Sequence, residues 1–160
     1  MTMHLIITPL QHQSDAQLCA EFMYTSDPWQ RLQSSYTGLL AMFADESKEI
    51  YVAKMANELV GFMVLHMNGA FVGYLQTIGV FPAWQGRGIG RKLIAFAEKR
   101  VFTDSPNLFL CVSSFNKRAQ KFYQTLGYAV VGELKDYLVA GHAEILMRKS
   151  IAPWHRFRNE

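Results

Sequence analysis

The chain has 160 residues, of which 50% are hydrophobic and 18% charged, and its formal net charge at pH 7 is +3. Such a length corresponds to about one domain with a real hydrophobic core, and the composition is that of an ordinary soluble globular protein. The mild positive charge suits an anionic small ligand, whereas a nucleic-acid binder would carry a far more basic surface. We therefore expect no nucleic-acid partner.

No segment of the chain is typical of export, membrane insertion or metal binding. No stretch approaches 18 consecutive apolar residues, and the apolar part of Met1 to Pro9 is too short for a signal peptide. The two cysteines, Cys19 and Cys111, lie far apart, with no Cys-x-x-Cys pair and no histidine pair at ligand spacing. We expect a cytoplasmic protein with no membrane partner, no metal and no disulfide.

The first half of the chain predicts one strand, two helices and then three strands. Asp27-Pro28 separates the two helices, and turns at Asn57-Glu58 and Asn68-Gly69 separate the three strands. In chain order, the predicted elements are a strand at 4–8, a helix from 14 to about 23, a helix at 29–43, and strands at 49–55, 59–67 and 71–81.

The second half predicts two helices that alternate with strands. Its elements are a helix at 91–102, a strand at 108–113, a helix from Asn116 that Gly127 caps, and strands at 128–134 and 144–148. The order β-α-α-β-β-β-α-β-α-β-β predicts an α/β (α+β) fold, a mixed central sheet flanked by helices. No linker or repeat divides the chain, so we expect one domain over residues 1–150 and a loose polar tail at 151–160.

A glycine-rich loop, Gln85-Gly86-Arg87-Gly88-Ile89-Gly90, lies between the strand at 71–81 and the helix at 91–102. Three glycines remove side chains where backbone N–H groups can point at one ligand, and the helix N-terminus adds partial positive charge. Arg87 and Arg91 add full charges. The loop therefore predicts a phosphate or pyrophosphate site.

Two common phosphate motifs do not match this loop. A P-loop requires Lys-Ser or Lys-Thr after its second glycine, where this chain has Ile89-Gly90. The dinucleotide fingerprint requires a third glycine three residues after its second, where this chain has Arg91 after Gly88. The remaining pattern, Gln-x-x-Gly-x-Gly after a strand, resembles the pyrophosphate loop of the GNAT superfamily of N-acetyltransferases.

Residues 116–128, with the sequence NKRAQKFYQTLGY, resemble a second motif of that superfamily. An Asn opens the helix, a Tyr follows seven residues later, and Leu-Gly-Tyr comes after it. With both motifs present in order, the chain is similar to the single-domain acetyl-CoA-dependent N-acetyltransferase fold over residues 3–149. The resemblance implies that the strands at 71–81 and 108–113 splay apart and hold acetyl-CoA, the co-substrate, between them.

The resemblance also implies roles for particular residues. Ile78, Gly79 and Val80 would lie along the pantetheine arm and the acetyl group, with backbone N–H groups polarising the thioester carbonyl. Asn116 would hydrogen-bond the pantetheine amides, although it is also suited to a plain helix N-cap. The residues implied to hold the pyrophosphate are Gln85, Gly86, Arg87, Gly88, Ile89, Gly90 and Arg91.

Tyr123 would be the general acid, and it would also contact the cofactor. A phenol with an ordinary pKa of about 10 stays protonated at pH 7 and can give its proton to the departing thiolate. Periodicity alone would place Tyr123 in the core, because it lies on the apolar face of its helix.

The general base is where the chain departs from the superfamily. Two positions that hold a Glu in relatives hold Tyr74 and Cys111 here. A thiol within an apolar strand is typical of inert core rather than of a nucleophile. The other candidates are a chain of waters or the polar side chains near the final strand pair, which equally suit turns and strand edges: Asp136, Tyr137, His142 and Glu144.

The acceptor amine is expected between the first two helices and the final hairpin, where the resemblance implies contacts with Trp29, Tyr74 and Tyr137. Without an evident carboxylate, the chain favours an amine of low pKa, because deprotonating a Lys amine at physiological pH costs about 4 kcal/mol. Asp27 could attract a cationic amine but also suits the turn before Pro28. The further acceptor candidates are Tyr24, Tyr36 and Phe71.

The sequence thus predicts an N-acetyltransferase that moves an acetyl group from acetyl-CoA directly to a primary amine of a small molecule, peptide or protein. It would act as a monomer or homodimer. The alternative is a non-catalytic acyl-CoA-binding module that kept the glycine loop and lost the base. Binding of nucleic acid through the basic tail is disfavoured, because two arginines supply too little charge at physiological salt.

Overall fold

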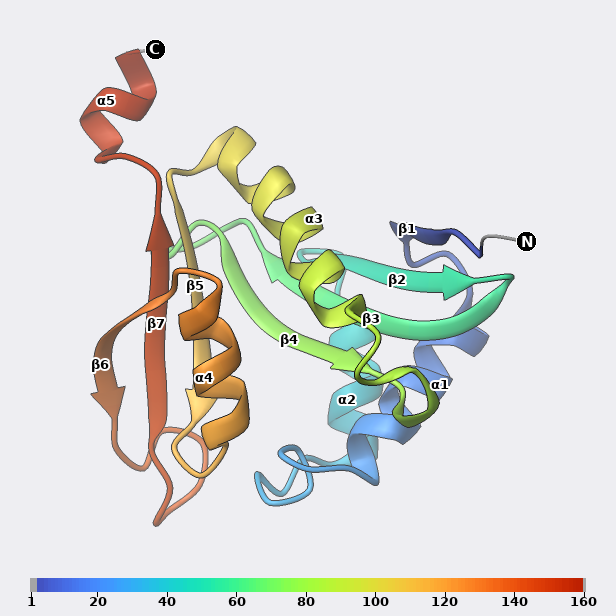
Figure 1. The fold of residues 1–160 in the computed structure, drawn as a ribbon. Coiled ribbons are helices and arrows are strands. Elements are labelled where there is room, and N and C mark those ends of the chain that lie inside the picture. Colours follow the sequence, from blue (N-terminus) through green and yellow to red (C-terminus); the bar gives the residue numbers. More distant parts are fainter. Residues whose placement is uncertain (1–2, 160) are drawn as a thin grey trace.

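The computed structural model describes residues 3–159, which form one mixed seven-stranded sheet with helices on both faces (Figure 1). Met1, Thr2 and Glu160, which the predicted domain and tail include, lie outside the described residues. The strands are β1 (Leu5–Pro9), β2 (Glu49–Met55), β3 (Glu58–His66), β4 (Tyr74–Val80), β5 (Asn107–Ser113), β6 (Ala129–Leu134) and β7 (Glu144–Ser150). The helices are α1 (Gln13–Tyr24), α2 (Tyr36–Phe43), α3 (Ile89–Asp104), α4 (Lys117–Thr125) and α5 (Trp154–Asn159).

The strand order is β1-β2-β3-β4-β5-β7-β6. Strands β4 and β5 run parallel, and the other neighbouring strands run antiparallel. The predicted fold class and the predicted order of elements up to β7 are confirmed. Within residues 3–159, none of the helices combines the length and the apolar character needed to cross a membrane.

Three predicted segments differ from the structure. The helix expected at 29–43 begins only at Tyr36, because Ser35 caps it: the Ser35 Oγ accepts a hydrogen bond from the N–H of Gly38 at 3.1 Å. The strand expected from residue 71 begins at Tyr74, after Gly73 with a left-handed φ of 87°. The tail expected to be loose contains the short helix α5, which projects beyond the end of β7 (Figure 1).

Each face of the sheet has its own hydrophobic core. Helices α3 and α4 cover one face, where Leu93 and Tyr123 are buried with Leu110 of β5. Helices α1 and α2 cover the other face over β2 to β4, where Met23 and Phe62 are buried. Because side chains alternate along a strand, each residue of β4 and β5 is assigned to one of these faces.

A bulge in β4 separates the two central strands. Val64 of β3 pairs with Thr77, whereas the next residue, Leu65, pairs with Leu75, so Gln76 is an extra residue in β4. Such a bulge bends the strand that carries it. The pairing of β4 with β5 is limited to Tyr74–Phe109 and Leu75–Leu110, after which the strands diverge (Figure 1). The splayed central strands expected from the resemblance are therefore present.

Candidate active site

The glycine loop between β4 and α3 has an open backbone. Gly86 and Gly88 take left-handed φ angles of 74° and 78°, and a Cβ on either would have no heavy atom within 4 Å. Gly88 is the N-cap of α3, and its carbonyl accepts a hydrogen bond from the N–H of Lys92 at 3.1 Å. The N–H groups of Ile89, Gly90 and Arg91 precede this first bond and have no acceptor within the helix. The loop thus offers donors and the positive end of a helix to an anion.

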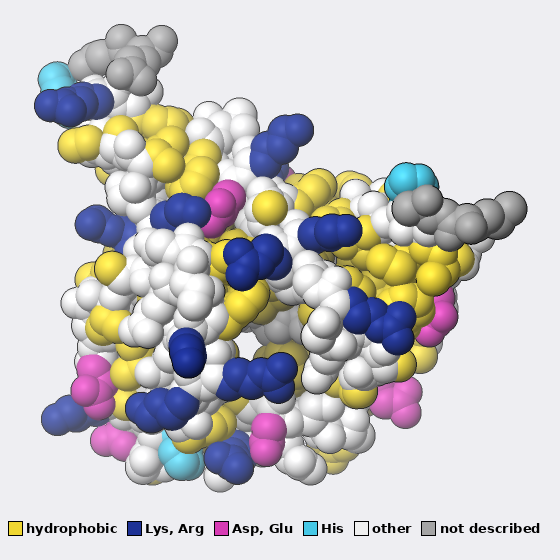
Figure 2. All heavy atoms as spheres, viewed as in Figure 1, with side chains coloured by type: hydrophobic (Ala, Val, Ile, Leu, Met, Phe, Trp, Pro, Cys, Tyr) yellow, Lys and Arg dark blue, Asp and Glu magenta, His cyan; other side chains and the backbone are white. Residues whose placement is uncertain are grey.

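Side chains fix the shape of this loop and add positive charge near it. The Nε2 group of Gln85 donates a hydrogen bond to the carbonyl of Val80 at 3.0 Å, which ties the loop to the end of β4. The guanidinium of Arg87 lies over the Trp84 ring, 4.9 Å from its centroid. Lys and Arg side chains gather around the hollow between α3 and α4 on the face shown in Figure 2. These charges favour an anionic ligand, and the pyrophosphate site stays a prediction.

A groove of about 1220 Å³ runs through the gap between β4 and β5. The groove connects the residues predicted to hold acetyl-CoA with the residues predicted to hold the acceptor amine. At the cofactor end its lining includes Ile78, Gly79, Val80, Gly90, Asn116 and Tyr123. The part that we call the acceptor end is lined by Met23, Trp29, Leu32, Leu39, Met42, Phe71, Tyr74, Cys111, Ser113, Tyr137, Leu138 and Glu144.

The backbone of β4 directs a donor into the gap. The N–H of Phe81 donates a hydrogen bond to the carbonyl of Val60 on β3 at 2.9 Å. Peptide groups alternate between the two edges of a strand, so the N–H of Val80 points away from β3 and toward β5. A donor at that position suits the carbonyl oxygen of a thioester.

Asn116 and Tyr123 come from the start and the middle of the α4 segment. Asn116 is the N-cap of α4, since its Oδ1 accepts a hydrogen bond from the N–H of Ala119 at 3.1 Å, and it also lines the groove. Tyr123 is buried, with 7% of its surface exposed, and burial raises the pKa of its hydroxyl above the ordinary value. A phenol in this state keeps its proton at neutral pH, which suits a proton donor.

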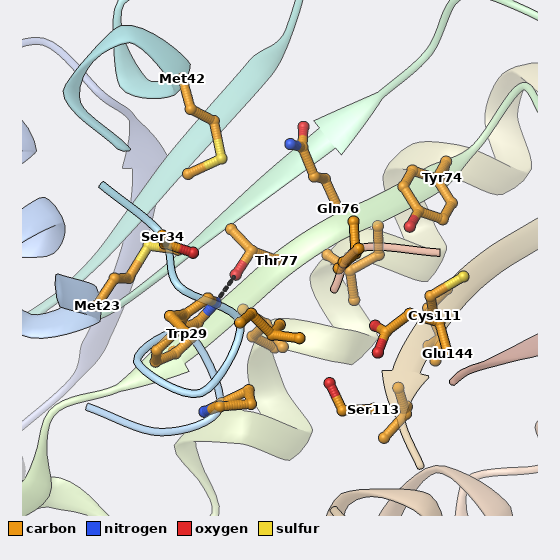
Figure 3. A pocket seen from close by; sticks show the side chains of 18 of the residues that line it. Met23, Trp29, Ser34, Met42, Tyr74, Gln76, Thr77, Cys111, Ser113 and Glu144 are labelled. Carbon is orange, nitrogen blue, oxygen red and sulfur yellow. Dashed lines mark hydrogen bonds between the residues drawn. The ribbon is translucent and has the colours of Figure 1, made fainter. Parts of the chain in front are cut away.

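The predicted acceptor residues fall into two groups. Trp29, Phe71, Tyr74 and Tyr137 line the acceptor end. The indole N–H of Trp29 donates a hydrogen bond to the Thr77 hydroxyl at 3.1 Å, which anchors the turns between α1 and α2 to β4 (Figure 3).

The second group lies outside the groove. The Tyr24 and Tyr36 rings pack edge-to-face on the surface with centroids 6.1 Å apart, and neither residue belongs to the groove lining. Asp27 also lies outside that lining and pairs with Arg31 at 3.4 Å. The structure therefore gives no support to a role for these three residues in the acceptor end.

Of the four side chains considered as the base, two reach the groove. Tyr137 and Glu144 line the acceptor end, whereas Asp136 and His142 are outside the lining. The Oδ1 of Asp136 accepts a hydrogen bond from the N–H of Gly141 at 2.7 Å and so closes the connection between β6 and β7. Glu144 lies beside Ser113 and Cys111 (Figure 3), and burial raises the pKa of its carboxyl, an effect partly offset by a hydrogen bond from Ser113 and by the charge of His142.

Tyr74 and Cys111, at the positions where relatives carry a Glu, face each other at the acceptor end (Figure 3). Burial raises the pKa of the Tyr74 hydroxyl and of the Cys111 thiol above their ordinary values. A raised thiol pKa leaves less of the nucleophilic thiolate at neutral pH. This agrees with the expectation that Cys111 is not the reactive group.

Comparison with known proteins decides the family. The profile of the Acetyltransferase (GNAT) family matches residues 14–128, which is more than half of the chain. The chain belongs to the acetyltransferase (GNAT) family. The family expected from the two motifs is thus confirmed, and the expected enzyme class, an acetyl-CoA-dependent N-acetyltransferase, is confirmed at the level of the family.

Individual relatives agree with this membership. The N-alpha-acetyltransferase RimI of Mycobacterium tuberculosis is 33% identical over 145 residues, which are 85% of this chain and 87% of RimI. A protein of Mycobacterium leprae is 32% identical over 148 residues, which are 89% of this chain but only 39% of that longer relative. A solved structure of a GNAT-family protein from Desulfovibrio desulfuricans has a TM-score of 0.76 at 19% identity, covers 93% of this chain and 100% of its own, and shows the shared fold.

Proposed function

We propose that this protein transfers the acetyl group of acetyl-CoA directly to a primary amine, with both substrates bound at once. The observation that carries the proposal is the gap between β4 and β5, where one groove joins the open glycine loop to an aromatic acceptor end. In this proposal the N–H groups at the start of α3 hold the pyrophosphate, and the pantetheine arm lies along residues 78–80.

The chemistry then uses groups on both sides of the gap. The N–H of Val80 polarises the thioester carbonyl, and the neutral amine attacks the carbonyl carbon. The C–N bond forms, the C–S bond breaks, and the Tyr123 hydroxyl gives its proton to the departing thiolate. The buried Tyr123 phenol also lines the groove, where it could give its proton to the thiolate, so Tyr123 favours the enzyme over a non-catalytic acyl-CoA-binding module.

The lining of the acceptor end supports an amine that carries an apolar group. Most of its side chains are aliphatic, aromatic or Met, and the one lysine among the described lining residues, Lys48, pairs with Asp45 at 3.4 Å. A polycationic acceptor would need several carboxylates, and among the described residues the whole groove lining has only two acidic side chains, Glu144 at the acceptor end and Asp45, which pairs with Lys48. The name of the RimI relative, an N-alpha-acetyltransferase, supports the α-amine of a peptide as such an acceptor.

A screen for release of the CoA thiol tests this function. The panel compares peptides with apolar N-terminal residues and apolar alkylamines with polyamines and aminoglycosides. We expect thiol release with the apolar amines, together with an acetylated product of the expected mass. Turnover of the polycations alone would contradict the proposed acceptor class, and binding of acetyl-CoA without turnover of any amine would favour the non-catalytic module.

A matched pair of variants checks where the acceptor binds. Met42→Glu adds a carboxylate to the acceptor end, and it should lower kcat/KM for apolar amines about tenfold or more while acetyl-CoA affinity stays unchanged. Leu18→Glu adds the same charge at an exposed position of α1 outside the groove lining, and it should change neither. Equal effects of the two variants would place the acceptor elsewhere.

A further inference from the structure

Glu144 is a buried carboxylate, and one of its two oxygen atoms has no hydrogen-bond partner among the described residues. Only 5% of its surface is exposed, and among the described residues its Oε2 atom is buried without a hydrogen-bond partner. A buried carboxylate oxygen in this condition is costly for the folded state. Glu144 also lines the acceptor end, where a positively charged ligand could supply the missing partner.

The sheet register brings Glu144 to the face that carries the acceptor end. Glu144 of β7 pairs directly with Ser113 of β5, so the two side chains lie on one face. By alternation along β5, Cys111 shares this face, and the pairing of Tyr74 with Phe109 adds Tyr74 to it. Figure 3 shows these side chains grouped around one end of the pocket.

No lysine or arginine among the described groove residues is paired with this carboxylate, and the one nearby charge that lowers its pKa belongs to His142, outside the groove lining. The titratable groups that face it are Tyr74 from β4, Cys111 from β5, and Tyr137 and His142 from the connection between β6 and β7. Lys48, the one lysine or arginine among the described lining residues, already pairs with Asp45. The position is therefore free for an ammonium group that arrives with a ligand.

Glu144 and Tyr123 lie on opposite faces of the sheet, and both line the groove that runs through the gap between β4 and β5. Tyr123 is buried in the core formed with α3, where Leu110 and Val112 point from β5. Glu144 belongs to the opposite face with Ser113. An acetyl group held in the gap would thus have a proton donor on the cofactor side and a carboxylate on the acceptor side.

We propose that Glu144 is the catalytic base, which binds the ammonium group of the acceptor and takes its proton. The proposal rests on the proposed function and places the base on β7, away from the two vacant Glu positions. The ammonium gives one proton to Glu144, and the resulting amine forms the C–N bond as the C–S bond breaks. The thiolate takes the Tyr123 proton, the second nitrogen proton restores Tyr123, and Glu144 releases its proton to solvent with the product.

The surroundings of Glu144 suit this task. Burial raises the pKa of its carboxyl, which brings it closer to the pKa of an amine and makes it a stronger base than an exposed carboxylate. With a base in place, an amine of high pKa is no longer disfavoured as the acceptor. The acceptor class is then set by the apolar lining rather than by the pKa of the amine.

The test compares Glu144→Gln with the parent and with Glu133→Gln, which removes an exposed carboxylate of β6 outside the groove lining. For an apolar alkylamine of high pKa, Glu144→Gln should lower single-turnover rates about 10²-fold or more, whereas acetyl-CoA affinity stays unchanged. The loss should be much smaller for an apolar acceptor of low pKa, and it should shrink as the pH approaches the pKa of the amine. Glu133→Gln should match the parent throughout.

Stability measurements separate a catalytic role from a structural one. Because the folded protein disfavours the ionised form of Glu144, the parent loses stability as the pH rises from the ordinary carboxyl range through the raised pKa. The Tm of Glu144→Gln should therefore equal or exceed that of the parent, with a difference that grows from pH 4 to pH 8. A structural residue would instead give a lower Tm in the variant.

The outcomes distinguish the inference from the proposed function. If the parent acetylates amines and Glu144→Gln does so at the same rate for acceptors of every pKa, Glu144 is not the base. A uniform loss with every acceptor and at every pH, joined to a lower Tm, would likewise overturn it. If the parent binds acetyl-CoA but acetylates no amine, the proposed function fails, and the role of Glu144 fails with it.

Discussion

Tyr123 and Tyr128 are neighbouring tyrosines whose hydroxyl groups lie in different surroundings. Their rings pack edge-to-face with centroids 5.8 Å apart, and both are buried. The Tyr128 hydroxyl donates a hydrogen bond to the Oε1 of Glu98 at 3.1 Å, whereas Tyr123 lines the groove. The hydroxyl of Tyr128 is therefore used within the protein, whereas the hydroxyl of Tyr123 is available to a ligand in the groove.

Replacing Tyr123 by Phe tests its role as the acid. The ring packing is kept and only the hydroxyl is lost, so acetyl-CoA affinity should change by less than about 1 kcal/mol. The single-turnover rate of acetyl transfer should fall about 10²-fold or more, because the thiolate loses its proton donor. Tyr128→Phe is the matched control and should keep the parent rate. A Tyr123→Phe variant as fast as its control would assign the tyrosine to packing.

At the scale of elements, the first turn of α3 belongs to the fold and is also the predicted pyrophosphate site. One substitution there can separate its effect on stability from its effect on binding. Gly90 lies in the first turn of α3, and a Cβ there would meet only the Phe122 ring at 3.7 Å and a Val80 methyl at 3.9 Å, which are ordinary contacts. A side chain at Gly90 is therefore compatible with the fold. It would nevertheless stand at the predicted pyrophosphate site, because Gly90 belongs to the groove lining.

Gly90→Asp should change stability and binding in opposite directions. A negative charge in the first turn of a helix is favourable, so the Tm should stay unchanged or rise. The same charge would repel the pyrophosphate, so the dissociation constant of acetyl-CoA, measured by calorimetry, should rise well over tenfold. Gly90→Ala separates the added bulk from the added charge. Unchanged affinity in a folded Gly90→Asp variant would mean that the pyrophosphate binds elsewhere.

At the scale of the whole molecule, the sheet consists of two parts that meet at β4 and β5 over two residue pairs. The groove occupies the space where this pairing ends, so each part supplies one wall. Helix α5 lies away from this groove, beyond the end of β7 (Figure 1). Its side chains pack on each other, with the Trp154 and Phe157 ring centroids 5.7 Å apart and Arg158 over the Trp154 ring.

Deleting residues 153–160 should therefore leave the domain intact. We expect the Tm, the acetyl-CoA affinity and the rate of thiol release to match the full chain, since none of residues 153–159, the described part of this segment, lines the groove. Sedimentation of both forms would show whether the mass in solution changes. A loss of affinity or a change of mass would mean that α5 contacts the domain or a second copy.

Local chemistry along the chain was enough to predict the elements and the backbone features at the starts of α3 and α4. Gly88, with its left-handed φ at the start of α3, and Asn116, as the N-cap of α4, occupy the places that their residue types favour. Hydrophobic periodicity predicted the order of elements, because the repeat of apolar residues that marks a helix or a strand extends over only a few neighbouring residues. The helix expected from Trp29 was wrong because Gln33 takes a left-handed φ of 56° and Ser35 caps a helix that begins only at Tyr36.

Tertiary structure alone decided the acceptor end. Glu144 and Ser113 are far apart in the sequence, and only the register between β5 and β7 makes them neighbours. The bulge at Gln76 likewise depends on pairing with β3, and it decides where β4 leaves β5. The sequence by itself determined the family and the glycine-rich turn at the start of α3, because those signals are local. Which carboxylate reaches the groove was decided by strand pairing, because register is a property of two strands and not of either one.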